Sequence, residues 1–300
     1  MTILIILLVI FLLFILFVEE LYRYVFCRPA SVLFTKLFDK KGHEEAYYEA
    51  RDSAAERLLK EPAERCTVKS ARGEELCGFY YPCGDGTGKL AFVVHGYRSE
   101  HNWTAAIVYD YYKSRGFDVF APDHAAHGES EGRHIGFDVT EAEDCLLWLR
   151  FLTEKLGPNL RIVLHGFSMG AATVLRMAGR CPPAVKLIVE DSGFRCAKEV
   201  LGHQVGPLYG LLQLLHCLIA HINLRESDVR PSLEKCRLPI FFVHGQDDKL
   251  VPYQNGPALF ESYEGPKACF FPEKTRHIEA MYTEPLEYAR RLDLFLDSYF

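Results

Sequence analysis

The chain alternates short apolar segments with longer segments that favour helix, and no other feature restricts its fold as much. The apolar segments have the length and composition of buried β-strands. They are residues 75–81, 90–94, 118–121, 161–165, 186–189, 240–243 and 268–271. Segments that favour helix lie at 104–115, 138–156, 169–179 and 285–299. This alternation predicts an α/β fold, in which helices cover both faces of a mostly parallel, twisted sheet.

Residues 166–170 have the sequence Gly-Phe-Ser-Met-Gly and stand between one of these strands and the helix that follows it. A Cβ at either glycine would collide with the adjoining strand or helix in so tight a turn. A serine in this position is held in strained backbone geometry with its hydroxyl exposed, an arrangement called the nucleophile elbow. A chance occurrence in a loop is the alternative. The flanking strand and helix favour the elbow, with Ser168 as nucleophile.

Four segments carrying reactive side chains follow predicted strands. They are residues 95–97 (His-Gly-Tyr), Ser168, residues 244–248 (His-Gly-Gln-Asp-Asp) and His277. Sites in open parallel sheets lie beyond the carboxyl ends of the strands. The agreement of unrelated segments on one sheet edge therefore predicts a single site there.

A serine hydroxyl needs a base, usually a histidine oriented by a carboxylate, and in this architecture the chain order is serine, acid, histidine. Among the histidines after Ser168, we favour His277 as the base because it follows the last strand and precedes the final helix. His244 directly follows a strand and precedes Gly245, a position typical of a turn. The carboxylate is Asp247 or Asp248, and we favour Asp248. The alternative for Asp247 is a turn-forming aspartate bonded to its own backbone.

Negative charge that develops on a substrate oxygen needs preset hydrogen-bond donors. The backbone N–H of Met169, directly after Ser168 at the start of a helix, is one candidate. The N–H of Tyr97, in the loop after strand 90–94, is the second. A plain strand-to-helix turn is the alternative for residues 95–98.

Residues 2–18 contain neither a charge nor a helix breaker. As a helix they would extend about 25 Å, slightly less than a typical hydrocarbon core. No lysine or arginine precedes this segment and no small-residue cleavage site follows it, so we expect an uncleaved single-pass anchor rather than a signal peptide. A core helix is disfavoured because the segment is apolar on all sides. The basic residues after the span favour a cytoplasmic domain, but Glu19 and Glu20 offset them, and the side of the membrane stays open.

These patterns predict three parts: an anchor at 1–26, a helical connection at 27–64 and a catalytic domain at 65–300. Residues 193–236 interrupt the alternation and contain an apolar run, which favours a helical cap that closes over the site and supplies an acyl pocket. An ordinary crossover helix with a long loop is the alternative. A chain that begins near Glu44 is expected to be soluble and active.

Other classes of function find little support in the composition. The net charge is −6 and no run of lysines and arginines occurs, so nucleic acid is not an expected partner. The ten cysteines have no paired spacing, and no zinc motif is present. We therefore expect neither a metal nor a cofactor.

Residues 65–300 resemble the α/β-hydrolase superfamily and, more narrowly, bacterial membrane-anchored hydrolases grouped with serine aminopeptidase-like and lysophospholipase-like members. The matching motifs are 95–97, 127–130, 166–170, 244–252 and His277. The pattern H-G-x-x-D-x-x-V-P of such relatives implies that Asp248 is the acid. One departure is that Ala125 and Ala126 stand where relatives often have an arginine and a glycine, which puts loop packing in doubt.

The leading hypothesis is a serine hydrolase that cleaves carboxylic esters through a Ser168–His277–Asp248 triad and an acyl-enzyme. The anchor and the apolar cap favour lipid-like or acylated substrates. Peptidase or amidase activity is the alternative within the same chemistry. A non-catalytic, membrane-tethered binding module is the alternative from another class. The sequence does not indicate the oligomeric state.

Overall fold

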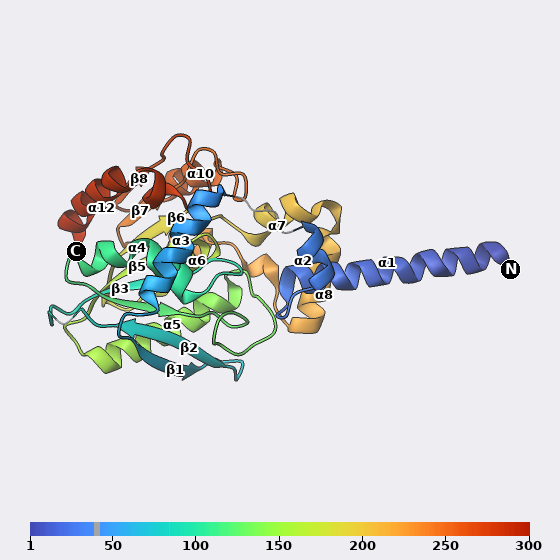
Figure 1. The fold of residues 1–300 in the computed structure, drawn as a ribbon, viewed down its shortest axis with the longest axis horizontal. Coiled ribbons are helices and arrows are strands. Elements are labelled where there is room, and N and C mark those ends of the chain that lie inside the picture. Colours follow the sequence, from blue (N-terminus) through green and yellow to red (C-terminus); the bar gives the residue numbers. More distant parts are fainter. Residues whose placement is uncertain (39–42, 84) are drawn as a thin grey trace.

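The computed structural model describes residues 1–38, 43–83 and 85–300, and its centre is a twisted eight-stranded sheet (Figure 1). The strands are β1 (Glu64–Lys69), β2 (Glu75–Tyr81), β3 (Lys89–Val94), β4 (Asp118–Pro122), β5 (Arg161–Phe167), β6 (Val185–Asp191), β7 (Ile240–Val243) and β8 (Lys267–Phe270). Their order is β1-β2-β4-β3-β5-β6-β7-β8. The pairs β1–β2 and β2–β4 are antiparallel, and all the others are parallel. The predicted fold class is confirmed.

Helices cover both faces of the sheet. One face carries α5 (Val139–Leu156), α6 (Met169–Met177), α9 (Arg230–Leu233) and α10 (Asn255–Ser262). The other carries α3 (Glu45–Leu58), α4 (His101–Lys113), α11 (Ala280–Thr283) and α12 (Pro285–Tyr299). Side chains of β3 alternate between the two cores: Phe92 and Val94 enter the first, whereas Ala91 and Val93 enter the second. This period of two is the pleat of a strand buried on both sides.

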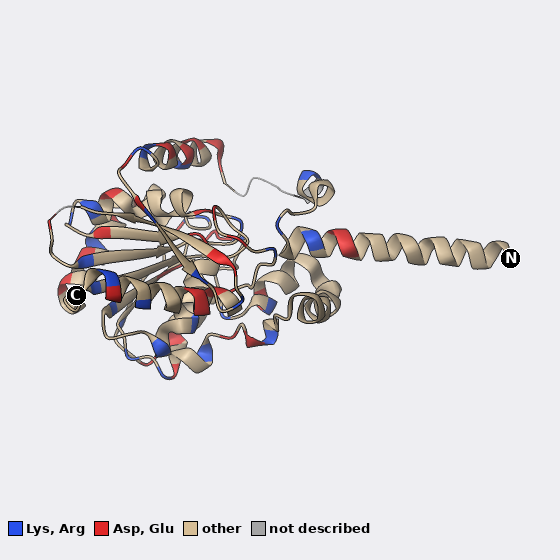
Figure 2. Cartoon of the chain, turned by 90° about the horizontal axis from the view of Figure 1, so that it is seen from below, with Lys and Arg blue, Asp and Glu red and all other residues tan. Residues whose placement is uncertain are grey.

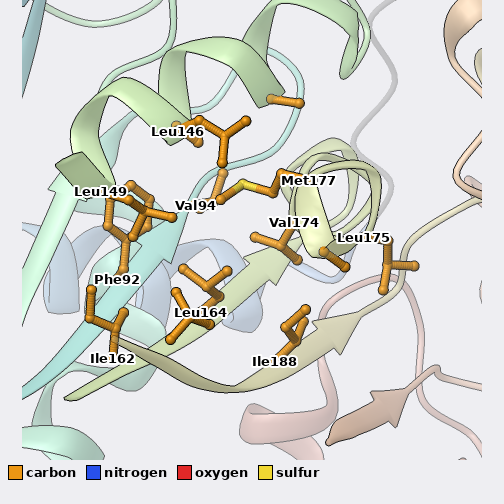
Figure 3. Close-up of a cluster of buried hydrophobic side chains, with 14 of the residues drawn as sticks. Phe92, Val94, Leu146, Leu149, Ile162, Leu164, Val174, Leu175, Met177 and Ile188 are labelled. Carbon is orange, nitrogen blue, oxygen red and sulfur yellow. The ribbon is translucent and has the colours of Figure 1, made fainter. Parts of the chain in front are cut away.

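The first core is shown in close-up in Figure 3. Leu146 and Leu149 of α5 and Val174 and Met177 of α6 meet the apolar side chains of the central strands. Because α6 begins directly after Ser168, this packing fixes the direction in which the chain leaves the proposed elbow.

A third apolar cluster lies beside the sheet, where residues 193–236 form α7 (Ala197–Val205), α8 (Tyr209–Ala220), α9 and short 3-10 turns. Hydrogen bonds join the two ends of this segment to the main domain. The hydroxyl of Ser227 donates to Asp138 Oδ2 (2.6 Å) and accepts the N–H of Ala197 (2.8 Å). Residues 196 and 228 also form an isolated β-bridge.

Helix α1 (Thr2–Phe26) projects from the end of the protein where α8 and the short helix α2 (Val32–Phe38) lie (Figure 1). Its charged residues are confined to the end next to the protein body (Figure 2). Of the described helices it is the one long and apolar enough to cross a membrane, with a mean hydropathy of 3.2 over its most apolar window. A signal sequence would pass the same test, whereas a core helix would be mostly buried and this window is 6% buried.

The last two turns of α1 belong to the third cluster. Val18, Leu21, Tyr22, Val25 and Phe26 are buried there against the cap. We call residues 18–26 the base of α1. The third cluster therefore includes the last part of the segment that the sequence predicts as an anchor at 1–26. A chain that begins near Glu44 would lack seven buried side chains of this cluster, so we expect it to be less stable than the full chain.

Two further differences from the sequence expectations concern strand β1 and the start of helix α4. Strand β1 was not expected, because its sequence, Glu-Arg-Cys-Thr-Val-Lys, is mostly polar. It lies at the sheet edge, where only Cys66 is fully buried, and polar residues are tolerated in such a strand. Helix α4 starts at His101, three residues before the expected 104.

Candidate active site

Ser168 occupies the turn between β5 and α6 with φ 56° and ψ −119°, a conformation that an L-residue adopts only under constraint. The flanking glycines explain how the turn fits. A Cβ on Gly166 would lie 2.3 Å from the carbonyl oxygen of Gly170, and one on Gly170 would lie 2.1 Å from that of Val94. Both clearances are far below van der Waals contact. The steric reason that the sequence indicates for the two glycines therefore holds in the structure.

The loop after β3 lies directly against this turn. A Cβ on Gly96 would be 3.0 Å from the Cβ of Ser168, and one on Gly170 would be 2.6 Å from the carbonyl oxygen of His95. Met169 is the first residue of α6, and the first N–H groups of a helix have no partner within it. The loop that carries Tyr97 and the first residue of α6, Met169, thus both adjoin Ser168, and their N–H groups stay the predicted oxyanion donors.

Buried histidines hold the loop that carries Tyr97. His127 Nδ1 is 2.9 Å from the Ala125 carbonyl, so it donates there, and Nε2 accepts the N–H of Arg98 at 3.1 Å. Burial lowers the pKa of His127 to about 3, which keeps the ring neutral and able to accept. His95 also bridges two backbone segments, bonding the carbonyl of Gly96 (2.8 Å) and the N–H of His124 (2.9 Å). The positioning role of these two histidines could not be expected from the sequence.

The segment with the two alanines is well packed. Ala125 and Ala126 are each 3% exposed, and the N–H of Ala126 donates to the Glu131 carbonyl at 2.8 Å. Within the same segment, Asp123 accepts the N–H groups of His101 and Glu129. The loop is therefore closely packed, and Ala126 adopts φ 62°, a left-handed conformation that glycine takes up more readily than alanine.

Asp248 and His277 form the shortest contact of the site, with Asp248 Oδ2 2.6 Å from His277 Nδ1 and both side chains buried. The other carboxylate oxygen of Asp248 accepts the N–H groups of Leu250 and Val251, each at 2.9 Å. Burial alone would raise the pKa of Asp248, but the His277 and His244 imidazoles lower it below its usual value. An ionised Asp248 fixes the proton of His277 on Nδ1 and leaves Nε2 free to act as a base. Asp247, in contrast, is exposed.

His244 is a second imidazole beside the same carboxylate. Its Nε2 lies 3.3 Å from Asp248 Oδ2 and 3.0 Å from the Val251 carbonyl oxygen, and its side chain is fully buried. The sequence favours a turn for this residue and gives no signal of the contact with Asp248. Among the described residues, no cluster of three histidine, cysteine or acidic side chains that could hold a metal ion is present.

The segments that carry Ser168 and His277 are attached to the same dipeptide at the end of β6. Ser168 donates its N–H to the carbonyl of Asp191 (2.8 Å), and the hydroxyl of Ser192 accepts the N–H of Ile278 (3.2 Å). The Tyr288 hydroxyl donates a hydrogen bond to Asp191 Oδ2 (3.2 Å). Burial raises the pKa of Asp191 to about 6. Asp191 and Ser192 therefore hold both segments at one edge of the sheet. The sequence did not predict this role for either residue.

A cavity of about 810 Å³ opens between α7 and α8. Its lining includes Cys196, Tyr209, Gln213, Leu224 and Arg225 but none of the expected catalytic residues. Leu201 and Leu212 of the insertion belong to the third cluster, which also includes Met169.

Known proteins resemble this chain in sequence and in fold. The model of the family "Serine aminopeptidase, S33" matches residues 87–216. The uncharacterized protein YqkD of Bacillus subtilis is 26% identical over 77% of this chain and 78% of its own length. The lysophosphatidylserine lipase ABHD12 of Danio rerio is 28% identical over 55% of this chain and 46% of its own. The esterase Pf2001 of Pyrococcus furiosus superposes with a TM-score of 0.66 and 20% identity over 81% of this chain and 92% of its own.

The sheet order, the strained turn after β5 and these relatives together define a hydrolase. The fold is that of the α/β-hydrolase superfamily, which the chain also resembles in sequence.

Proposed function

We propose that the protein is a serine hydrolase that cleaves carboxylic esters, with Ser168 as nucleophile, His277 as base and Asp248 as the carboxylate that orients the base. The observation that carries the proposal is the buried 2.6 Å contact between Asp248 and His277 at the sheet edge where the strained turn presents Ser168. The sequence alternative Asp247 is exposed and receives no such support.

The proposed reaction has two halves. The Ser168 hydroxyl attacks the ester carbonyl while His277 Nε2 takes its proton, and the tetrahedral oxyanion is stabilised by the N–H groups of Tyr97 and Met169. Collapse of this intermediate breaks the bond to the alcohol, which leaves with the proton from His277. Water, deprotonated by His277, then attacks the acyl-enzyme and releases the carboxylic acid and Ser168.

Lipid-like or acylated esters are the substrates that we favour. Two features support them: α1, which we propose as a single-pass membrane anchor, and the apolar cluster that joins the base of α1 and the cap to Met169. The relative from Danio rerio is named a lysophosphatidylserine lipase. Cleavage of amides or peptides is the second candidate, because the matching family model is described as a serine aminopeptidase.

A fluorophosphonate probe, which labels activated serines, tests the nucleophile. We expect labelling of the full-length protein and of Ser262→Ala, whose hydroxyl bonds only a helix carbonyl, but not of Ser168→Ala. Equal labelling of Ser168→Ala would overturn the assignment, and no labelling of folded wild type would favour a non-catalytic binding module. Hydrolysis of p-nitrophenyl esters of increasing chain length, beside aminoacyl amides, then separates the two substrate classes.

A further inference from the structure

Helix α8 is apolar on all sides but is buried on only one. Its sequence, Tyr-Gly-Leu-Leu-Gln-Leu-Leu-His-Cys-Leu-Ile-Ala, contains no lysine, arginine, aspartate or glutamate. Leu212, His216 and Ala220, spaced four residues apart, face the third cluster and are buried. A surface helix of a water-soluble domain normally presents polar residues on its other side.

The outer side of α8 instead presents leucine and isoleucine. Leu214, Leu218 and Ile219 are 54%, 63% and 52% exposed. Helix α2 behaves in the same way, since Val32 and Leu33 are 67% and 56% exposed while Phe34 is buried. We call these five exposed residues the apolar collar. Exposed apolar side chains gathered at one end of a protein indicate a contact with a partner or a membrane.

Both helices of the collar are held against the base of α1. The His216 ring of α8 stacks on Phe26, with ring centroids 4.1 Å apart, and its Nδ1 lies 3.2 Å from the Tyr22 hydroxyl. In α2, the Phe34 ring lies 6.0 Å from that of Tyr24. Figure 1 shows α2 and α8 at the end of the protein from which α1 projects. The collar therefore lies where the exposed part of α1 ends.

The length of α1 decides how close this end of the protein comes to a bilayer. The exposed large apolar side chains along α1 end at Phe17, and the first buried one is Val18. Sixteen or seventeen helical residues extend about 25 Å, whereas the hydrocarbon core is about 30 Å thick. A span that is short by a few ångströms draws the adjoining surface to the headgroups.

We propose that the apolar collar is a second membrane contact, which lies in the interface of the bilayer that α1 spans. The occupant is the headgroup and upper acyl region of phospholipids. Apolar side chains on short helices suit this region, and the exposed Lys36 of α2 is long enough to reach outward to the headgroups. The proposal concerns binding and is independent of the hydrolase mechanism.

Tryptophan fluorescence of the full-length chain tests the contact. Leu218→Trp places a reporter in the collar, and Leu294→Trp, 57% exposed on α12, is the matched control. Each variant is inserted into phosphatidylcholine nanodiscs that hold one copy, with or without bromine at acyl carbons 6 and 7. We expect bromine to quench the added emission of Leu218→Trp at least twofold more than that of Leu294→Trp. Circular dichroism checks that both variants keep the wild-type fold.

Equal, weak quenching of the two variants in inserted protein would overturn the proposal. A second copy of the chain is the competing occupant of the collar. Blue-shifted emission of Leu218→Trp that appears only in discs with two copies, without bromine quenching, would also reject the membrane contact. Introducing Leu214→Ser and Ile219→Ser beside Leu218→Trp should lower the quenching toward the control, because the collar then loses its apolar area.

Discussion

The sheet edge that carries Ser168 and the seam between α1 and the cap are built on different principles. At the sheet edge, Asp248, His277 and the neighbouring loops are fixed by hydrogen bonds between buried polar groups. At the seam, Tyr22, Phe26 and His216 are held mainly by ring packing. A polar site loses function when one atom changes, whereas an apolar seam loses stability in proportion to the area removed. Substitutions at the sheet edge should therefore lower activity, whereas substitutions at the seam should lower stability.

Shortening the N-terminus should have the largest effect. Removal of residues 2–17 takes away exposed side chains and should leave the melting temperature of the remaining chain nearly unchanged. Removal of residues 2–43 also takes the five buried side chains of the base of α1, worth about 10 kcal/mol together, which is comparable with the stability of a whole domain. Thermal melts followed by circular dichroism check this pair. Equal cooperative melting of both chains would show that the seam is dispensable.

Asp248→Asn should affect turnover rather than stability. An amide cannot hold the proton of His277 on Nδ1 as a carboxylate does, and the loss in kcat should be about 10⁴-fold, the size of the same change in serine proteases. Asp247→Asn, at an exposed neighbouring position, should change kcat less than threefold. Hydrolysis of a p-nitrophenyl ester measures both. A larger loss for Asp247→Asn would reverse the assignment of the acid.

Acidification should weaken the seam through His216. Burial lowers the pKa of His216 to about 3, while an unfolded histidine has a pKa near 6.5. As the pH falls from 7.5 to 5, the unfolded chain therefore binds a proton that the folded chain does not. This histidine alone should cost about 2 kcal/mol of stability over that interval.

Urea unfolding at the two pH values isolates this contribution. His216→Phe keeps the stacking on Phe26 but removes the titrating group, so its stability should fall about 2 kcal/mol less than that of wild type. His203→Phe, at an exposed position of α7, is the control and should keep the wild-type difference. An unchanged difference in His216→Phe would place the pH sensitivity elsewhere.

Tyr97→Phe should have the smallest effect on stability and activity. Tyr97 lies between the two regions. The Tyr97 hydroxyl donates to the Val25 carbonyl in the last turn of α1 at 2.9 Å, and Arg98 binds the neighbouring Tyr24 carbonyl. Loss of one such hydrogen bond should cost about 1 kcal/mol of stability. If the Tyr97 loop also donates to the oxyanion, kcat should fall a few-fold with little change in KM. A normal kcat together with lower stability would confine Tyr97 to a structural role.

The sequence predicted those parts of the molecule that depend on local pattern. Continuous apolar runs identified the buried parallel strands, and the two glycines identified the turn at Ser168. The sequence did not predict the edge strand β1, because this strand is mostly polar. It pairs with β2 through backbone hydrogen bonds, which most residue types can form. The close contact of Asp248 with His277 was expected from chain order, and the geometry supports it.

Other features depend on contacts between distant residues and left no local pattern. Phe26 and His216 are 190 positions apart, so nothing near Phe26 indicates that an apolar helix will pack against the cap. Asp191 and Ser192 support the site through a backbone carbonyl and a hydroxyl, for which residue type gives little guidance. His244 adjoins Asp248 only because of the fold of the intervening turn.

The Ser227 hydroxyl, which joins Asp138 to the first turn of α7, limits how residues 193–236 can move. With the bridge between residues 196 and 228, it fastens the two ends of the cap to each other and to the start of α5. A hinged lid that swings away as one body would have to break these buried bonds. We therefore expect motion of the insertion in its middle, from the end of α7 through α8, while both of its ends stay in place.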